Sequence, residues 1–586
     1  MFLVIKITYC TQSSLVEIRY TILHTEKCAL SYQKFLPHIC YWRPYISTTS
    51  KKKTMPIDIE DLRAFKGGDP EKVRESERRR FNDTARVDKV IALDDKWREC
   101  RGQADNLRKE KRLISKQFQE YAKEKKDLTP LREKSNEFTA LIAAKEQEMI
   151  DSAAQRDVLL KEIGNYVHDS VPRFEHEELE DGTLQNEIES THGTETRRVF
   201  ADSKVHKDDK RMDMVETKED LLQRNAELGG GPDGALLRHH QLLQRLGGYN
   251  PEAGVKVAGS RCYFLKGAGV SLNYALQMYA QNFLINQDYT LLQPPYFMRK
   301  DVMGGVAQLA EFDEALYHVS GGDETEKGNE REKYLIATSE QPICGFHMNE
   351  WMREKELMEN PIKYAGVSTC FRKEAGSSGK DMRGIFRVHQ FEKIEQFVIA
   401  HPDKSWEMHE EMLGQCKVFT QSLGLSYRVV NIVSGDLNNA AAKKYDMEAW
   451  FPGYDDFREI VSCSNCLDYQ SRSMEIRCGQ PAAKADKGKG KESRKVYVHM
   501  LNSTLCACTR LICCILENFQ TPEGVVIPEV LLPFMPNKIM KTDEKGRKYL
   551  PYVEDLVADV EDKSLKKKKQ KKKKSKGNGE TKQGGN

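Results

Sequence analysis

Apolar and small side chains recur at alternating steps of three and four between positions 88 and 126, a stretch without proline in which Gly102 is the only glycine. The positions are Val90, Leu93, Trp97, Cys100, Ala104, Leu107, Ile114, Phe118 and Tyr121, and only Lys111 interrupts the series. This spacing is typical of a heptad seam sustained over more than four heptads. It predicts one long helix of about 58 Å, at 1.5 Å per residue.

A second helical pattern follows Thr129-Pro130, where proline suits the first turn of a helix because the N–H that it lacks would be unpaired there. Its apolar stripe is formed by Leu131, Phe138, Ile142, Met149, Leu159 and Ile163. Gly164 and Pro172 end it. Two long helices joined by a short turn predict an antiparallel hairpin.

The far end of this hairpin, residues 98–126, holds ten basic and five acidic residues. Two interpretations are open. One is a solvated coiled coil used for dimerisation, which composition alone favours slightly. The other is a basic arm that reaches a nucleic-acid backbone.

The pattern changes after the hairpin. Residues 173–255 are polar and glycine-rich, which predicts a connector with one short helix at 235–246. From 259 to about 536, aromatic and β-branched runs alternate with helical stretches, the runs lying at 364–371, 385–391, 396–399, 427–432 and 495–501. Strands this closely spaced predict a mainly antiparallel sheet with helices packed on it, an α+β fold.

Charge is distributed unevenly along the 586 residues. The net charge of +3 combines +10 over residues 563–586, +6 over residues 1–54 and −13 over the body between them. The total therefore names no partner. No run approaches the ~20 apolar residues of a membrane span, which excludes an integral membrane protein of that kind.

Fifteen cysteines without framework spacing indicate reduced thiols in a reducing compartment. Residues 1–54 lack the organisation of a secretory signal. They are poor in acidic residues and contain Ser and Thr, so a mitochondrial transit peptide is one interpretation. The other, which we favour, is an extension with no role in the fold, since Met55 begins a stretch that reads as an ordinary N-terminus.

Common catalytic and metal-binding motifs are absent from the sequence. There is no Gly-x4-Gly-Lys-Ser/Thr loop and no Gly-x-Gly-x-x-Gly after a strand. The pair Cys463 and Cys466 has no second pair at a usual zinc spacing, so packing is the preferred interpretation and no zinc is expected.

Three segments carry a different chemistry. The first, 271–295, is an amphipathic helix followed by a short apolar run and two prolines. The second places Arg372 and Phe391 on a strand and its return strand, and the third sets Arg510 at the start of a helix after a strand. Guanidinium groups bind phosphate oxygens bidentately, and a carboxylate such as Glu459 can hold Mg²⁺. Ordinary ion pairs are the alternative.

These segments match the three motifs of class II aminoacyl-tRNA synthetases, and the chain closely resembles seryl-tRNA synthetases of the eukaryotic cytosolic type. The matching stretches are 333–342 (KYLIATSEQP), 371–374 (FRKE), 387–397 (RVHQFEKIEQF), 450–453 (WFPG), 461–466 (VSCSNC), 499–504 (HMLNST) and 515–520 (ILENFQ). The resemblance spans roughly residues 55 to 536. It implies ATP-dependent activation of L-serine to seryl-adenylate and transfer of the seryl group to the 3′ end of serine tRNA and of selenocysteine tRNA.

The resemblance also implies the site residues. Catalytic roles fall to Arg372, Glu459 and Arg510. ATP is expected at Arg372, Lys373, Glu374, Val388, His389, Gln390, Phe391, Glu459, Ile460, Val461, Ser462 and Arg510. Serine is expected at Thr338, Ser339, Glu340, Arg372, Glu395 and Asn502. Mg²⁺, carried by ATP, is expected at Glu459 and Ser462.

Further expectations follow from the resemblance. The hairpin becomes the tRNA arm, the segment 271–295 a homodimer interface, and the location cytoplasmic, with a minor nuclear or mitochondrial form open. The expected domains are the 1–54 extension, the 55–172 helical arm, the 173–258 connector, the 259–540 catalytic domain and the 541–586 disordered tail. Within that tail, the lysine run can be a solvated segment, an extension that adds tRNA affinity, or a nuclear localisation signal.

Some residues depart from the family pattern. Thr509 stands where many class II enzymes have glycine, and Ser378 replaces a histidine often found in that loop. Two rival functions also remain open. One is a binding protein on an inactive synthetase fold, which the presence of Arg372, Glu374, Glu395, Glu459 and Arg510 disfavours. The other is a coiled-coil nucleic-acid-binding protein whose C-terminal half is only scaffold.

Overall fold

The computed structural model describes residues 57–174, 228, 235–306, 315–321, 332–374, 383–479 and 496–553. The expectations for residues 1–54, for most of the connector, for Ser378 and for the lysine run lie outside the described residues. Among the described residues, no helix combines the length and the apolar character that crossing a bilayer requires.

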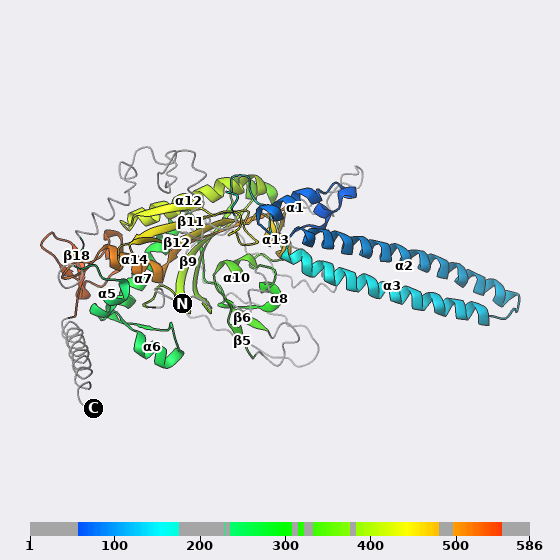
Figure 1. The fold of residues 1–586 in the computed structure, drawn as a ribbon, viewed down its shortest axis with the longest axis horizontal. Coiled ribbons are helices and arrows are strands. Elements are labelled where there is room, and N and C mark those ends of the chain that lie inside the picture. The colour runs from blue at the N-terminus through cyan, green and yellow to red at the C-terminus, as the bar shows by residue number, and fades with distance from the viewer. Residues whose placement is uncertain are drawn as a thin grey trace, which may run out of the picture. The chain divides into compact units, whose positions relative to one another are not determined.

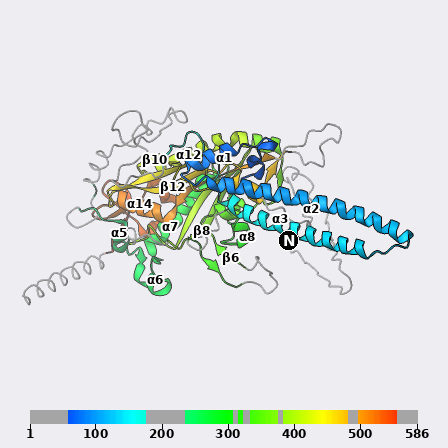
Figure 2. The same cartoon turned by 45° about the vertical axis from the view of Figure 1, so that its right-hand side comes forward.

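The predicted helical hairpin is confirmed. Helices α2 (Ala85–Lys123) and α3 (Thr129–Glu162) run side by side, as Figures 1 and 2 both show. Val90, Cys100, Ala104 and Ile114 of the predicted seam are buried. Lys111, which interrupts the apolar series, donates from Nζ to Thr139 Oγ1 of α3 at 2.7 Å. The seam therefore continues across that position through a polar contact.

The base of the hairpin is joined to the rest of the described chain by buried hydrogen bonds. Arg80, which follows α1 (Pro70–Arg79), is 4% exposed and donates to the carbonyl oxygens of Asn165, Leu437, Asn438 and Ala441. The Asn165 amide donates to the carbonyl oxygens of Ala440 and Cys466, both at 2.8 Å.

The central sheet has seven strands in the order β10-β11-β12-β15-β9-β8-β3. Their bounds are β3 (Thr290–Leu292), β8 (Ile362–Phe371), β9 (Gln390–Ala400), β10 (Tyr427–Asn431), β11 (Lys443–Phe451), β12 (Asp456–Asn465) and β15 (His499–Ala507). Every neighbouring pair is antiparallel except β3 with β8. The mainly antiparallel sheet of the expected α+β fold is confirmed.

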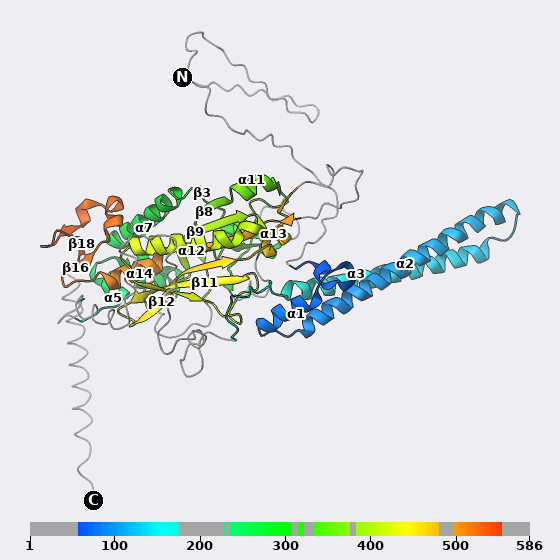
Figure 3. The ribbon, with the colours of Figure 1, turned by 90° about the horizontal axis from the view of Figure 1, so that it is seen from above.

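Three helices contribute most of the apolar core against this sheet: α7 (Gly267–Ile285), α12 (Ser405–Ser422) and α14 (Cys508–Asn518). Figure 3 shows them beside its strands. The helix predicted in segment 271–295 is present as α7, and the apolar run after it contains β3. The thiols of Cys416, Cys463, Cys506 and Cys513 are fully buried in this core, and all four cysteines are free.

One predicted strand is wrong. The run 385–391 is irregular up to His389, and β9 begins only at Gln390. Ile385 and Phe386 are buried as an apolar run suggests. Phe386 instead packs beneath two guanidinium groups, those of Arg458 and Arg510, with Cζ to ring-centroid distances of 4.9 and 5.0 Å. The tertiary contacts of this ring replace a strand pairing.

The remaining elements are short. The helices are α5 (His239–Arg245), α6 (Pro251–Ala258), α8 (Lys300–Met303), α10 (Glu340–Cys344), α11 (Glu354–Glu359) and α13 (Tyr469–Met474). The strands are β1 (Tyr249–Asn250), β2 (Phe264–Leu265), β4 (Phe297–Arg299), β5 (His318–Val319), β6 (Lys333–Leu335), β7 (Trp351–Met352), β13 (Arg477–Cys478), β14 (Val496–Tyr497), β16 (Gly524–Val526), β17 (Lys541–Thr542) and β18 (Lys548–Pro551). Helix α5 corresponds to the short helix predicted in the connector. Strand β18 lies between β16 and β17 and pairs with both. Strand structure therefore continues past the expected boundary at 540.

Candidate active site

Where the central strands border the cavity, alternation along them separates an apolar face from a polar one. On β9, Ile394 and Val398 belong to the core beneath the helices, whereas Lys393 and Glu395 line a cavity on the other face. Strand β15 repeats the pattern, with Leu501 in the core and Asn502 and Thr504 in the cavity. Successive side chains of a strand point to opposite faces, so the polar positions of neighbouring strands gather on one side.

A β-bulge brings Glu459 and Ser462 to the same face. They lie three positions apart on β12, which in a regular strand directs their side chains to opposite faces. Met447 of β11 pairs with Val461, the next position of β11 pairs with Glu459, and Ile460 is left without a partner. The extra residue shifts the alternation by one, so both predicted magnesium-binding residues line the cavity.

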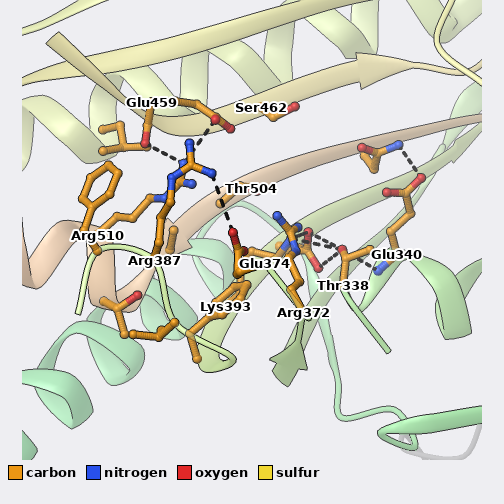
Figure 4. Close-up of a pocket in the computed structure, with 18 of the residues that line it drawn as sticks. Thr338, Glu340, Arg372, Glu374, Arg387, Lys393, Glu459, Ser462, Thr504 and Arg510 are labelled. Carbon is orange, nitrogen blue, oxygen red and sulfur yellow. Dashed lines mark hydrogen bonds and ion pairs between the residues drawn. The ribbon is translucent and has the colours of Figure 1, made fainter. Parts of the chain in front are cut away.

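The cavity has a volume of about 370 Å³ and is lined mostly by charged and polar side chains (Figure 4). Figure 4 shows two clusters that are separated along it, one around Thr338 and Glu340 and the other around Glu459 and Arg510. The predicted site residues that line it are Thr338, Glu340, Arg372, Glu374, Val388, Phe391, Glu395, Glu459, Ile460, Ser462, Asn502 and Arg510.

Glu395 is held by donors from two segments. Its Oε2 accepts from the backbone N–H of Ser339 at 2.7 Å and from Ser339 Oγ at 2.5 Å, and Thr338 Oγ1 lies 2.7 Å from both carboxylate oxygens. Lys393 Nζ lies 2.5 Å from Oε1. Burial acts to raise the pKa of Glu395, but the Lys393 ammonium and these hydrogen bonds outweigh it and hold the pKa below its usual range.

Glu340 has a different environment. Its Oε1 accepts from Gln470 Nε2 at 2.7 Å and from Asn502 Nδ2 at 2.9 Å. Burial raises the pKa of Glu340 to about 7, because the hydrogen bond from Gln470 offsets only part of the desolvation and the charge of Glu395 adds to it. The two carboxylates of this end therefore titrate in different pH ranges.

Arg372 follows the end of β8 and crosses the middle of the cavity. Its Cζ lies 5.5 Å from the Phe391 ring centroid, a cation–π contact, and its Nε lies 3.4 Å from the Ala337 carbonyl oxygen. The strand-loop-strand arrangement that the sequence predicts for Arg372 and Phe391 is thus present, with Cys370 of β8 paired with Phe391 of β9.

Glu374 and Arg387 face each other in the cavity. Arg387 Nη1 lies 3.6 Å from Glu374 Oε2, and Figure 4 shows the two side chains directed toward one another. Glu374 has φ of 49°, a left-handed conformation that non-glycine residues seldom adopt. The backbone turns sharply at the residue whose carboxylate points into the cavity.

Arg510 and Glu459 form the other end. Arg510 Nη1 donates to the backbone carbonyl of Glu459 at 2.9 Å and to its Oε2 at 3.1 Å. Burial acts to raise the pKa of Glu459, and the charge of Arg510, with smaller contributions from Lys444 and Arg372, lowers it below the usual value. A carboxylate that stays ionised beside a guanidinium group suits binding of a phosphate chain together with a cation.

Five predicted residues do not line the cavity. Ser339 is fully buried behind Glu395, and Val461 faces the core beneath the helices. The Lys373 backbone N–H donates to Ala315, His389 Nδ1 lies 3.0 Å from the Arg372 carbonyl oxygen, and Gln390 is exposed. Their roles remain predictions.

Other cavity residues were not assigned a role from sequence: Phe386, Arg387, Lys393, Asn438, Lys444, Ser464, Thr504, Ala507 and Thr509. A usable signal existed for Lys393. It stands two positions before Glu395 in a strand that is otherwise largely apolar, and two charges at that spacing share one face. Asn438 and Lys444 come from segments distant in sequence from the three motifs, and no local pattern points to them.

Across the described ranges, no group of three or more His, Cys, Asp or Glu side chains has the geometry to hold an ion. Cys463 and Cys466 are both buried, and burial raises the pKa of each thiol well above its usual value.

Two family models match the chain. The model described as "tRNA synthetase class II core domain (G, H, P, S and T)" matches residues 317–519, and the "Seryl-tRNA synthetase N-terminal domain" matches residues 57–167. The first range contains every residue that lines the cavity, and the second contains the hairpin.

Individual proteins match over most of the chain. Cytoplasmic serine–tRNA ligase of Danio rerio is 46% identical over 512 residues, covering 82% of this chain and 90% of the relative. A crystal structure of the cytoplasmic enzyme of Naegleria fowleri in complex with AMP matches with a TM-score of 0.64 and 43% identity, over 84% of this chain and 98% of that one. Seryl-tRNA synthetase of Pyrococcus horikoshii complexed with ATP matches with a TM-score of 0.66 and 33% identity, over 85% and 100%.

Proposed function

The chain belongs to the serine–tRNA ligase family, and from that membership we propose that it activates L-serine with ATP and transfers the seryl group to tRNA. The observation that carries the proposal is a single cavity in which Arg372 lies between the carboxylate-rich end around Glu340 and the Arg510–Glu459 end. Such a cavity can hold an amino acid and a polyphosphate side by side.

Activation requires no protein nucleophile. The carboxylate oxygen of serine attacks the α-phosphorus, the bond from that phosphorus to the bridging oxygen breaks, and pyrophosphate leaves. Catalysis then consists of positioning and of stabilising charge as it develops. We assign Arg372 to contact both the serine carboxylate and the α-phosphate, and Arg510 to contact the distal phosphates. Phe391 and the guanidinium group of Arg510 supply flat surfaces for the adenine.

Serine recognition is assigned to the end around Glu340. A carboxylate accepts from the substrate ammonium, and fixed hydroxyl and amide groups of Thr338 and Asn502 face the substrate hydroxyl. A pocket that hydrogen-bonds a substrate hydroxyl leaves its own polar groups unpaired when alanine enters. Discrimination of ~10⁴–10⁵ is within reach of such a pocket.

Mg²⁺ fits the Glu459 end. The bulge in β12 directs an ionised carboxylate and the hydroxyl of Ser462 into the same cavity, and hard oxygen donors are those that Mg²⁺ prefers. When it is bound together with ATP, the ion would neutralise part of the negative charge of the phosphates. We assign Glu459 and Ser462 to hold it.

The homodimer and the tRNA arm are part of the proposal. Helix α7 exposes Tyr274, Met278 and Ile285, with side chains 46–61% exposed, and β3 adds Leu291. A second copy would bury this apolar surface through an isologous contact.

The basic end of the hairpin would contact phosphates of serine tRNA and, by the same shape-based recognition, of selenocysteine tRNA. The named relatives are cytoplasmic, and we propose the same location here.

ATP–pyrophosphate exchange with each amino acid in turn tests the proposal. We expect exchange with serine, much weaker exchange with threonine and alanine, and none in Arg372→Ala. Removal of residues 98–126 should spare exchange and abolish tRNA charging. Absence of serine exchange would favour an inactive synthetase fold that binds nucleic acid, whereas equal exchange with all three amino acids would refute the assignment of serine as the substrate.

A further inference from the structure

Lys393 is a buried cation at the serine end of the cavity to which neither the sequence motifs nor the proposed chemistry gives a role. It projects from β9 two residues before Glu395, and the two side chains are only 7% and 5% exposed. Its Nζ contacts Glu395 Oε1 at 2.5 Å and donates to Thr338 Oγ1 at 3.1 Å.

These contacts fix the direction of each hydrogen bond. An ammonium group can only donate and an ionised carboxylate can only accept. Thr338 Oγ1 therefore accepts from Lys393 and must turn its own hydrogen toward Glu395. Among the described residues, four groups lie within reach of the Glu395 oxygens: Lys393 Nζ, Thr338 Oγ1, Ser339 N and Ser339 Oγ. This number matches the acceptor capacity of one carboxylate.

We propose that Lys393 is a positioning residue for serine recognition, which keeps Glu395 ionised and orients the Thr338 hydroxyl before the substrate arrives. The role rests on the proposed function and extends it to a residue outside the expected substrate contacts. A buried pair that loses one partner leaves an uncompensated charge, and the site relieves it by taking up a proton. A protonated Glu395 would have to donate, which would disrupt the donors arranged around it.

The charged and titratable groups around Glu395 determine how such a loss would be seen. They are Lys393 on β9, Glu340 and Cys344 on α10, and Cys370 and Arg372 at the end of β8. Lys393 and Arg372 favour the ionised form of Glu395, while Glu340 opposes it. Removing Lys393 removes the cation in direct contact, so burial and Glu340 would then raise the pKa of Glu395.

The test compares exchange kinetics of Lys393→Met with those of the parent enzyme between pH 5.5 and 8.5. Taking the ratio of the two kcat/KM values for serine at each pH cancels the titration of ATP, which is common to both enzymes. Glu340 feels the charges of Lys393 and Glu395, and the Glu395→Gln variant described next separates its titration from that of Glu395. We expect the ratio to be at least tenfold below one at pH 7 and to fall by a further tenfold per pH unit toward acid. KM for ATP should change by less than threefold.

Two further variants separate positioning from a merely structural role. The double variant Lys393→Met, Glu395→Gln should give a kcat/KM ratio to the parent enzyme that does not vary with pH, because the carboxyl group of Glu395 is gone. Lys393→Arg keeps the cation and should also give a flat ratio. Lys363→Met is the matched control, since Lys363 of β8 contacts Glu411 at 2.7 Å outside the cavity and its loss should leave kcat/KM within twofold.

A ratio for Lys393→Met that is independent of pH, or a parallel rise in KM for ATP, would overturn the role of Lys393. Absence of serine exchange in the parent enzyme would instead refute the proposed function. Thermal unfolding of each variant shows whether the fold is retained. A slope in the ratio that survives the Glu395→Gln change would assign the titration to another group and also overturn the inference.

Discussion

The side-chain amide of Gln470 donates a hydrogen bond of 2.7 Å from Nε2 to Oε1 of Glu340. Gln470 is 1% exposed and lies on α13. Its neighbour Tyr469 packs in the apolar core at the base of the helical hairpin, with Val87 and Leu160. Consecutive residues of one short helix thus contact the serine end of the cavity and the base of the arm.

Gln470→Met should raise KM for serine about tenfold, because Glu340 loses a donor that favours its ionised form, a hydrogen bond worth ~1.5 kcal/mol or more for a charged acceptor. KM for ATP should change by less than threefold. Steady-state exchange kinetics at pH 7.5 measure both. Gln415→Met is the control, since Gln415 of α12 donates to Glu411 outside the cavity. Equal effects of the two substitutions would contradict the assignment.

KM for serine should rise as pH falls through 7. The pKa of Glu340 is raised to about 7, so its ionised form, which attracts the substrate ammonium, prevails above that pH and is lost below it. We expect an increase of about tenfold between pH 7.5 and pH 6, one pH unit below the pKa. Glu340→Gln should bind serine weakly at every pH, without this dependence. A serine KM that is constant across this range in the parent enzyme would exclude Glu340 as the ammonium acceptor.

Gly366→Ala should destabilise the protein by about 2 kcal/mol and impair serine exchange. A Cβ at this position of β8 would lie 2.3 Å from Ser339 Oγ and 2.8 Å from Ile343 Cδ1, so the segment that donates to Glu395 must move. Gly414→Ala is the contrasting control. It lies inside α12 with no neighbour within 4 Å, and alanine there should stabilise by about 0.5–1 kcal/mol. Urea unfolding midpoints distinguish the two, and an unaltered midpoint for Gly366→Ala would be inconsistent with this packing.

Arg80→Met should cost about 3 kcal/mol of stability, because several buried carbonyl oxygens that Arg80 joins between the arm and the sheet domain would lose their donor. Arg78→Met removes an exposed guanidinium group of α1, paired with Glu71 and Glu75, and should leave the stability nearly unchanged. Chemical denaturation measures the difference. Similar costs for both would mean that the base of the arm does not depend on Arg80.

Periodicity predicted the long elements well. An apolar series of helical period is a local property of the chain, so α2 could be located from positions such as Val90 and Ile114, and α3 from positions such as Leu131. The closely spaced β-branched runs likewise indicated the antiparallel sheet. The strand predicted at 385–391 is wrong for a physical reason. Phe386 is buried by contacts with Arg458 and Arg510, and contacts of this kind do not require the alternation of a strand.

The motif residues were identified because their spacing resembles that of a known family, and most of them line one cavity. No motif includes Lys393, although it alternates with Glu395 along one strand. Lys444 and Asn438 could not be located, since they come to the cavity through the pairing of β11 with β12 and through a loop far along the chain.

The sequence alone was therefore sufficient to predict the class of fold, the helical arm and the family of the chain. The hydrophobic period and the spacing of motif residues are set by residues close to one another in the chain. Tertiary structure decided the relationships that depend on pairing and burial. The bulge at Ile460 brings Glu459 and Ser462 to one face, which strict alternation forbids. Burial and nearby charge also separate Glu340 from Glu395, two identical carboxyl groups whose pKa values shift in opposite directions because only Glu395 contacts a lysine.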